Sequence, residues 1–170
     1  DVLIPEQWLE IAHQRWKEAH GRQPVTTEPR IMGVDVAGMG RDCTCFVERQ
    51  GCWASEFKTH NSGGSADHMK IAGAITDRRR HEIEMYVSID TIGEGAGVFS
   101  RCVENERREN SHYIISCKYS EGAKGFNGKN LTDTTGQYEF LNMRAYLFWA
   151  VRDWLNPKNE TGAMLPPDPQ

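Results

Sequence analysis

Apolar positions fall into short strand-like runs in the first half of the chain. The run 31–35 is mainly apolar and ends at Asp35, glycines at 38 and 40 signal a turn, and residues 43–47 form a second apolar run. These features predict a hairpin that carries Asp35 in a sheet. Three further runs predict strands over residues 52–58, 85–90 and 113–117.

Helices are predicted where apolar residues recur every three or four positions. The predicted ranges are 5–20, 65–80, 98–109 and 137–155. Ser65 suits the cap of the second helix. The last helix is apolar around much of its circumference, so we expect it to be buried on more than one side.

The order of these elements predicts an α/β fold. We expect a mixed five-stranded sheet whose first three strands are antiparallel, with helices on both faces. We assign residues 1–29 to an N-terminal helix and linker, 30–156 to the main domain and 157–170 to a proline-rich tail. Because the chain starts without Met, we expect it to be part of a longer protein.

The composition of the chain excludes some classes of protein. The formal net charge of −4 over 170 residues argues against binding nucleic acid by bulk charge alone. It does not exclude a nuclease that other domains hold on DNA. No apolar run has the ~20 residues that a membrane helix requires. The five cysteines form no CxxC pair, and we expect Cys43 and Cys45 to be small core residues with reduced thiols.

Two aspartates carry the candidate chemistry. Asp35 ends the first predicted strand and Asp90 ends the fourth. If these strands are neighbours, their carboxylates meet at one edge of the sheet and require a cation. Mg²⁺ or Mn²⁺ suits such ligands, and a pair of these ions can activate water for phosphodiester hydrolysis. An Asp35 that merely caps its own turn is the simpler alternative.

Three stretches resemble the nuclease domain of the large terminase subunit of tailed bacteriophages, a ribonuclease-H-like fold. They are the segment from Gly33-Val34-Asp35 to Asp42, the segment from Ile89-Asp90 to Gly97-Val98, and the segment 140–155, a helix containing Asn142-Met143-Arg144-Ala145. The opening segment, Leu3-Ile4-Pro5 followed by Trp8, is similar to the connection between the packaging ATPase and the nuclease of that family. The resemblance spans nearly the whole chain.

The resemblance implies a role for each matching residue. Asp35 and Asp90 would be the catalytic ligands of two Mg²⁺ or Mn²⁺ ions. Asp42 would lie across the hairpin, as a turn cap or an outer residue of the site. The possible DNA contacts are Lys118, Lys124, Lys129 and Arg144, although solvated lysines are common in such loops. The family's third acidic ligand has no match, so we expect it beyond Gln170.

The implied activity is metal-dependent cleavage of concatemeric double-stranded DNA during viral genome packaging. The implied partners are DNA, an upstream ATPase domain, the small terminase subunit and the portal, in the host-cell cytoplasm. No GxxxxGK[ST] loop is present, so this chain is not the motor itself. Two alternatives remain: a catalytically silent DNA- or portal-docking module, and another ribonuclease-H-like nuclease such as a junction resolvase.

Overall fold

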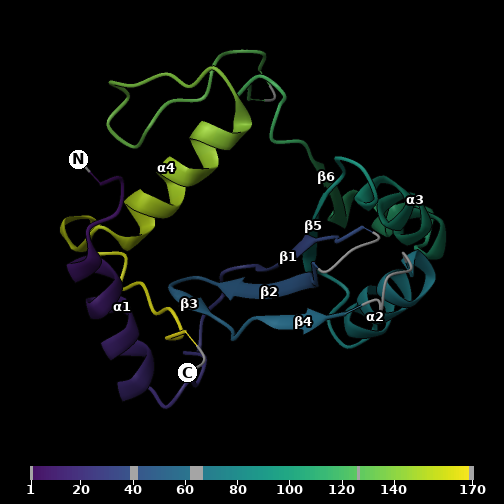
Figure 1. Cartoon of the computed structure of the whole chain (residues 1–170), viewed down its shortest axis with the longest axis horizontal. Helices are drawn as coiled ribbons and strands as arrows, with labels where there is room; N and C mark the ends of the chain where they lie inside the picture. The colour runs from purple at the N-terminus through teal and green to yellow at the C-terminus, as the bar shows by residue number, and fades with distance from the viewer. Residues whose placement is uncertain (1, 39–41, 62–66, 126, 169–170) are drawn as a thin grey trace. The chain divides into compact units, whose positions relative to one another are not determined.

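The computed structural model describes residues 2–38, 42–61, 67–125 and 127–168. The chain divides into two compact units, each of which is described by itself. We call Val25–Gly51 with Ser55–Cys117 the sheet unit, and Asp1–Pro24 with Cys52–Ala54 and Lys118–Gln170 the terminal unit. Figure 1 labels their helices and strands. None of the helices in the described ranges is long and apolar enough to cross a membrane.

The sheet unit is built on a mixed sheet. Strand β1 (Arg30–Asp35) lies between β2 (Thr44–Gln50) and β5 (Tyr86–Asp90), and β6 (Ile114–Cys117) follows β5. Strand β4 (Lys58–His60) pairs with β2. The pairs β1–β2 and β2–β4 are antiparallel, whereas β1–β5 and β5–β6 are parallel. The predicted mixed α/β fold, antiparallel at its start, is therefore confirmed, although the described residues form a six-stranded sheet instead of the expected five-stranded one.

Two helices pack against one face of this sheet. They are α2 (His68–Arg80) and α3 (Gly95–Asn105), and a 3₁₀ helix, η1 (Arg108–Tyr113), precedes β6. In the core, alternate residues of the strands pack against one stripe of each helix. The main core residues are Met32, Val34, Ile71, Ile75, Val87, Ile89, Val98 and Cys102. The Asp67 side chain caps α2 by accepting from Lys70 N–H at 3.2 Å. The predicted cap, Ser65, lies outside the described residues.

An ion-pair network ties β1 and β2 to α2. Glu48 accepts hydrogen bonds from Arg78 Nε at 2.7 Å and from Arg30 at 2.8 Å. Burial alone would raise the pKa of Glu48, but the hydrogen bonds from Arg78 and Arg30 hold this pKa below its ordinary value. Glu82 joins the network through Arg30 and Arg78.

The terminal unit combines α1 (Glu6–Glu18), β3 (Trp53–Ala54), α4 (Met143–Leu155) and the 3₁₀ helix η2 (Pro157–Asn159). Its small core is formed by Ala12, Leu155 and Ala163 with partly buried neighbours. The proline-rich segment after α4 packs into this unit: Met164 is buried and forms a β-bridge with Trp53. The indole of Trp16 donates to the Ala54 carbonyl at 3.0 Å, which fixes α1 beside this bridge.

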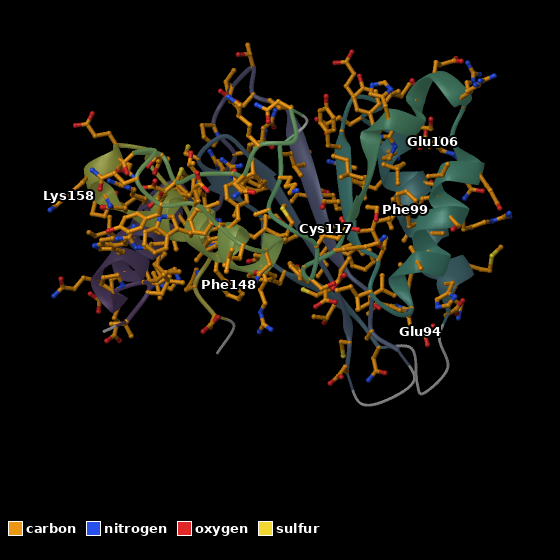
Figure 2. The ribbon with its side chains drawn as sticks, turned by 90° about the horizontal axis from the view of Figure 1, so that it is seen from above. Glu94, Phe99, Glu106, Cys117, Phe148 and Lys158 are labelled. Carbon is orange, nitrogen blue, oxygen red and sulfur yellow. The ribbon has the colours of Figure 1, made fainter. Side chains whose placement is uncertain are left out.

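The predicted last helix begins six residues late, at Met143 instead of Gln137. The Asp133 carboxylate accepts from the backbone N–H groups of Gln137 and Tyr138, and this holds that segment in a turn. Asn142 then caps α4 by accepting from Ala145 N–H at 2.9 Å. The expectation that this helix is buried on more than one side is also wrong, since Phe148, labelled in Figure 2, and Val151 are exposed by 53 % and 46 %.

Two smaller predictions change in detail. The third predicted strand is divided into β3 and β4, because Ser55 turns back and bonds Glu48 through its backbone and its hydroxyl. Cys43 and Cys45 are not core residues: Cys43 is exposed and Cys45 is only partly buried, whereas Thr44 between them is fully buried.

Candidate active site at the carboxyl ends of β1 and β5

Asp35 and Asp90 come together as neighbouring residues at one edge of the sheet. The parallel register pairs Val34 of β1 with Ile89 of β5, so the next residues along the two strands are the aspartates. Residues paired in this way lie on the same face of a sheet, on strands about 4.8 Å apart. Asp35 is exposed and Asp90 is half-buried. The condition set from the sequence, that these two strands are neighbours, is met.

The segment after β5 holds the Asp90 side chain in a fixed turn. Its Oδ1 accepts from Ile92 N–H at 3.0 Å. Thr91 N–H donates to the Cys117 carbonyl at 2.9 Å, and the Thr91 hydroxyl lies 2.6 Å from that of Ser116. Strand β6 thus anchors the chain directly after Asp90, and this limits how far the carboxylate can move.

Glycines permit α3 to start immediately beside this turn. Gly93 has φ +74°, a conformation that residues with a Cβ adopt at a cost. A Cβ placed on Gly95 would lie 1.7 Å from the Asp90 carbonyl oxygen, closer than any real contact. The glycine pattern after Asp90 therefore has a steric cause within the fold, in addition to the close approach of a phosphate that the resemblance implies.

Two thiols extend the row of aspartates on either side. In the antiparallel register Cys45 of β2 is directly opposite Asp35, and in the parallel register Cys117 of β6 pairs with Asp90. Burial raises the pKa of the Cys45 thiol, and the nearby Asp35 carboxylate raises it further. The sequence analysis placed Cys45 in the core, and it is the strand register that brings it beside Asp35.

A histidine–glutamate pair lies close by and was missed by the sequence analysis. His68 Nε2 is 2.7 Å from Glu94 Oε2. A Cβ on Gly38, three residues after Asp35, would be 3.2 Å from Glu94 Cγ, so this glutamate packs against the loop that follows β1. Figure 2 shows Glu94 and Glu106 at opposite ends of α3. An acidic residue between Gly93 and Gly95 was the available signal for Glu94. His68 falls on the same helical stripe as Ile71 and Ile75, and that spacing indicates packing.

The other predicted site residues lie apart from the aspartates or in the other unit. Asp42 is exposed before β2, where Cys45, not Asp42, is opposite Asp35. The basic candidates belong to the terminal unit and are all exposed: Lys118, Lys124, Lys129 and Arg144. Lys118 forms an ion pair with Glu121 at 3.2 Å, and Arg144 is the second residue of α4.

The donor set of this edge fits a hard divalent cation. Asp35 and Asp90 supply carboxylate oxygens, which Mg²⁺ and Mn²⁺ prefer, and both ions commonly keep several water ligands. Within the described ranges, no group of three or more His, Cys, Asp or Glu side chains is arranged to enclose an ion. Asp35 and Asp90 could hold an ion at this edge, with water at positions that no protein group occupies.

The same arrangement of elements occurs in solved structures of a viral nuclease domain. The nuclease domain of the large terminase subunit gp2 of bacterial virus Sf6 aligns with a TM-score of 0.64 and 17 % identity, covering 98 % of this chain and 73 % of that one. The chain therefore has the fold of this nuclease domain. A point mutant of the Sf6 domain with manganese and beta-thujaplicinol gives a TM-score of 0.65 at 18 % identity, and one with calcium gives 0.64 at 19 %. Each covers 98 % of this chain and 73 % of its own. No family model and no curated protein sequence matches the chain.

Proposed function

We propose that this chain is the metal-dependent endonuclease domain of a terminase, cleaving concatemeric double-stranded DNA during viral genome packaging. The observation that carries the proposal is the side-by-side placement of Asp35 and Asp90 at the carboxyl ends of neighbouring parallel strands. Ligand and metal sites of α/β sheets form at such edges. The fold is that of nuclease domains of which one was solved with manganese and another with calcium.

In this proposal Asp35 and Asp90 hold one or two Mg²⁺ or Mn²⁺ ions. When bound, such ions lower the pKa of a water ligand and neutralise charge on the scissile phosphate. The role of the protein in this proposal is to orient the ions. The hydrogen bond from Ile92 N–H to Asp90 Oδ1 limits the rotation of this carboxylate. Because the ligands address backbone phosphate and not bases, little sequence specificity is expected.

The remaining roles belong to the same proposal. Lys118, Lys124, Lys129 and Arg144 would contact DNA phosphates, and Asp42 would orient water around the ions. The upstream ATPase domain, the small terminase subunit and the portal would bring DNA to the site in the host-cell cytoplasm. A third ligand beyond Gln170 stays a prediction, and Glu94 offers a further carboxylate at the same edge.

The deciding experiment is plasmid cleavage with Mn²⁺ and with Mg²⁺ by the chain and by a version extended past Gln170. Asp35→Asn and Asp90→Asn keep the size of each side chain but remove its charge. We expect the cleavage rate to fall by about a thousandfold, the scale associated with lost electrostatic stabilisation of a transition state. The matched control is Asp77→Asn, which changes an exposed aspartate in the last turn of α2. Full activity in either site variant would refute the assignment.

The docking-module alternative is supported by the net charge of −4 and by the lack of a three-residue metal cluster in the described ranges. Mn²⁺ titration by calorimetry separates the two hypotheses without relying on activity. A nuclease should bind Mn²⁺ and lose affinity in Asp35→Asn. A docking module should show neither behaviour. Preference for branched over linear DNA would instead favour a resolvase.

A further inference from the structure

The histidine–glutamate pair connects the starts of α2 and α3. His68 is the first residue of α2, and Glu94 directly precedes α3. The Nε2 atom of His68 lies 2.7 Å from Oε2 of Glu94, and both side chains are half-buried. Because an ionised carboxylate only accepts hydrogen bonds, we assign a proton to Nε2, which donates to Glu94.

Two glycines make room for this pair. A Cβ placed on Gly97 would lie 2.9 Å from Nδ1 of His68, so the imidazole ring packs directly on α3. A Cβ placed on Gly38 would lie 3.2 Å from Cγ of Glu94. Gly38 follows Asp35 by three residues, so the glutamate packs against the segment through which the chain leaves β1. The pair is therefore built into the same edge of the sheet as the candidate metal ligands.

The geometry suits the two side chains to different roles. Nε2 of His68 is directed at Glu94 and Nδ1 lies against Gly97, so the histidine is placed to hold the glutamate and not to contact a substrate. A carboxylate has about four acceptor positions, and the bond to His68 occupies one of them. Glu94 can therefore accept further hydrogen bonds while its orientation stays fixed.

We propose that Glu94, oriented by His68, is a positioning residue for the divalent ion of the proposed nuclease. Within the described residues, no three-residue group of His, Cys, Asp or Glu encloses an ion, so the role of Glu94 is exerted through water. Glu94 accepts hydrogen bonds from the hydration shell of an ion held at Asp35 and Asp90. It also adds negative charge at this edge, and ion affinity depends on the charge and rigidity of a site. This inference rests on the proposed function and extends it.

Mn²⁺ titration of the purified chain by calorimetry, without DNA, tests this role apart from activity. Glu94→Gln keeps the size of the side chain and an oxygen that can accept from His68, but removes the charge. We expect the Kd for Mn²⁺ to rise by roughly tenfold, the lower end of the effects of groups that surround metal ligands. The matched control is Glu104→Gln, which changes an exposed glutamate of the same helix that pairs with Arg101 at 3.0 Å. This control should bind Mn²⁺ as the wild type does.

Two substitutions of His68 separate positioning from a purely structural role. His68→Leu removes the donor to Glu94 and should weaken Mn²⁺ binding, whereas His68→Gln supplies an amide N–H in its place and should restore it. Equal binding by these two variants would refute the role of His68. A purely structural pair would lower the free energy of unfolding in Glu94→Gln and leave the Mn²⁺ affinity of the folded protein unchanged. That result, or an equal loss of affinity in Glu104→Gln, would overturn the proposal.

Asp35→Asn distinguishes failure of this inference from failure of the proposed function. If Mn²⁺ binding is lost in Asp35→Asn but unchanged in Glu94→Gln, the metal site stands and the role of Glu94 is refuted. If wild type binds no Mn²⁺, or if Asp35→Asn binds it equally well, the proposed metal site is refuted and the role of Glu94 with it.

Plasmid cleavage gives a second measurement in an active enzyme. Glu94→Gln should need roughly ten times more Mn²⁺ than wild type for a half-maximal rate, and should reach the wild-type rate at saturating Mn²⁺. A rate that stays low at saturation would overturn the assignment of Glu94 as a residue that acts through ion binding.

Discussion

The two compact units differ in how their cores are built. In the sheet unit, alternate residues of neighbouring strands meet apolar stripes of α2 and α3 and form one continuous core. In the terminal unit, three buried residues, Ala12, Leu155 and Ala163, come from segments far apart in the sequence. Periodic patterns create the first core, whereas individual long-range contacts create the second. The candidate metal ligands, Asp35 and Asp90, belong to the sheet unit, and the basic residues proposed to contact DNA belong to the terminal unit.

The distribution of tryptophans makes it possible to follow the unfolding of one unit independently of the other. All five tryptophans, Trp8, Trp16, Trp53, Trp149 and Trp154, lie in the terminal unit. Tryptophan fluorescence therefore reports on that unit, whereas far-UV circular dichroism reports on helices of both. A substitution confined to the sheet unit should move the two signals by different amounts if the units unfold separately, and by equal amounts if they unfold as one.

The largest effect is expected from Gly95→Ala in the sheet unit. The new Cβ would lie 1.7 Å from the Asp90 carbonyl oxygen, so β5 and α3 would have to separate. We expect a loss of about 3 kcal/mol or more in the free energy of unfolding, at the upper end of overpacking effects. Urea unfolding followed by circular dichroism and by tryptophan fluorescence measures this loss.

The matched control for this prediction is Gly73→Ala. Gly73 lies within α2, and a Cβ placed on it would meet no atom within 4 Å. Removing a glycine from a helix interior should stabilise the protein by about 0.5–1 kcal/mol. Similar changes in the two variants would mean that backbone entropy, and not the contact with Asp90, determines the result at Gly95.

How much was predictable from sequence also differs between the units. Strands β1, β2, β5 and β6 were anticipated because apolar runs bounded by glycine and polar turns have few alternative structures. The sequence placed Asp35 and Asp90 at strand ends, but their pairing depended on the two strands being neighbours, which the structure shows. The partner of Glu94 could not be predicted, because His68 is 26 positions away in the sequence and its position in α2 matched an apolar stripe. Cys45 was misassigned because alternation gives two faces and does not say which one is buried.

In the terminal unit the pattern itself was misleading. Residues 137–155 have helical periodicity, but Asp133 draws the backbone N–H groups of Gln137 and Tyr138 into a turn before the helix can start. Met164 is buried by its bridge to Trp53, a contact across 111 positions that no local pattern encodes. The structure of the terminal unit therefore depends on hydrogen bonds from side chains to the backbone and on β-bridges between residues far apart in the sequence. The structure of the sheet unit depends instead on periodic apolar patterns.

A middle-sized effect is expected from Glu48→Gln in the ion-pair network of the sheet unit. Arg78 and Arg30 would lose the carboxylate that they share, although the amide can still accept a hydrogen bond. We expect a loss of about 2 kcal/mol near neutral pH, below the cost of breaking a fully buried pair.

The pH dependence of this loss has a definite sign. The pKa of Glu48 is lowered in the folded state, so its contribution is complete above the ordinary value of 4.5 and is lost as the pH falls through the lower folded value. The stabilities of wild type and Glu48→Gln should therefore converge only in acid. Urea midpoints across this range measure the gap, and a gap that persisted at the acid end would mean that lost packing, not charge, explains the variant.

The smallest effect is expected from Asn142→Ala in the terminal unit. Removing the cap of α4 leaves the Ala145 N–H without its side-chain acceptor, which should cost about 1 kcal/mol. Asp67→Ala removes the corresponding cap of α2 in the sheet unit and should cost a similar amount. Tryptophan fluorescence should detect the loss in Asn142→Ala more strongly than the loss in Asp67→Ala if the units unfold separately. An Asn142→Ala variant of unchanged stability would indicate that the turn around Asp133, and not the cap, sets the start of α4.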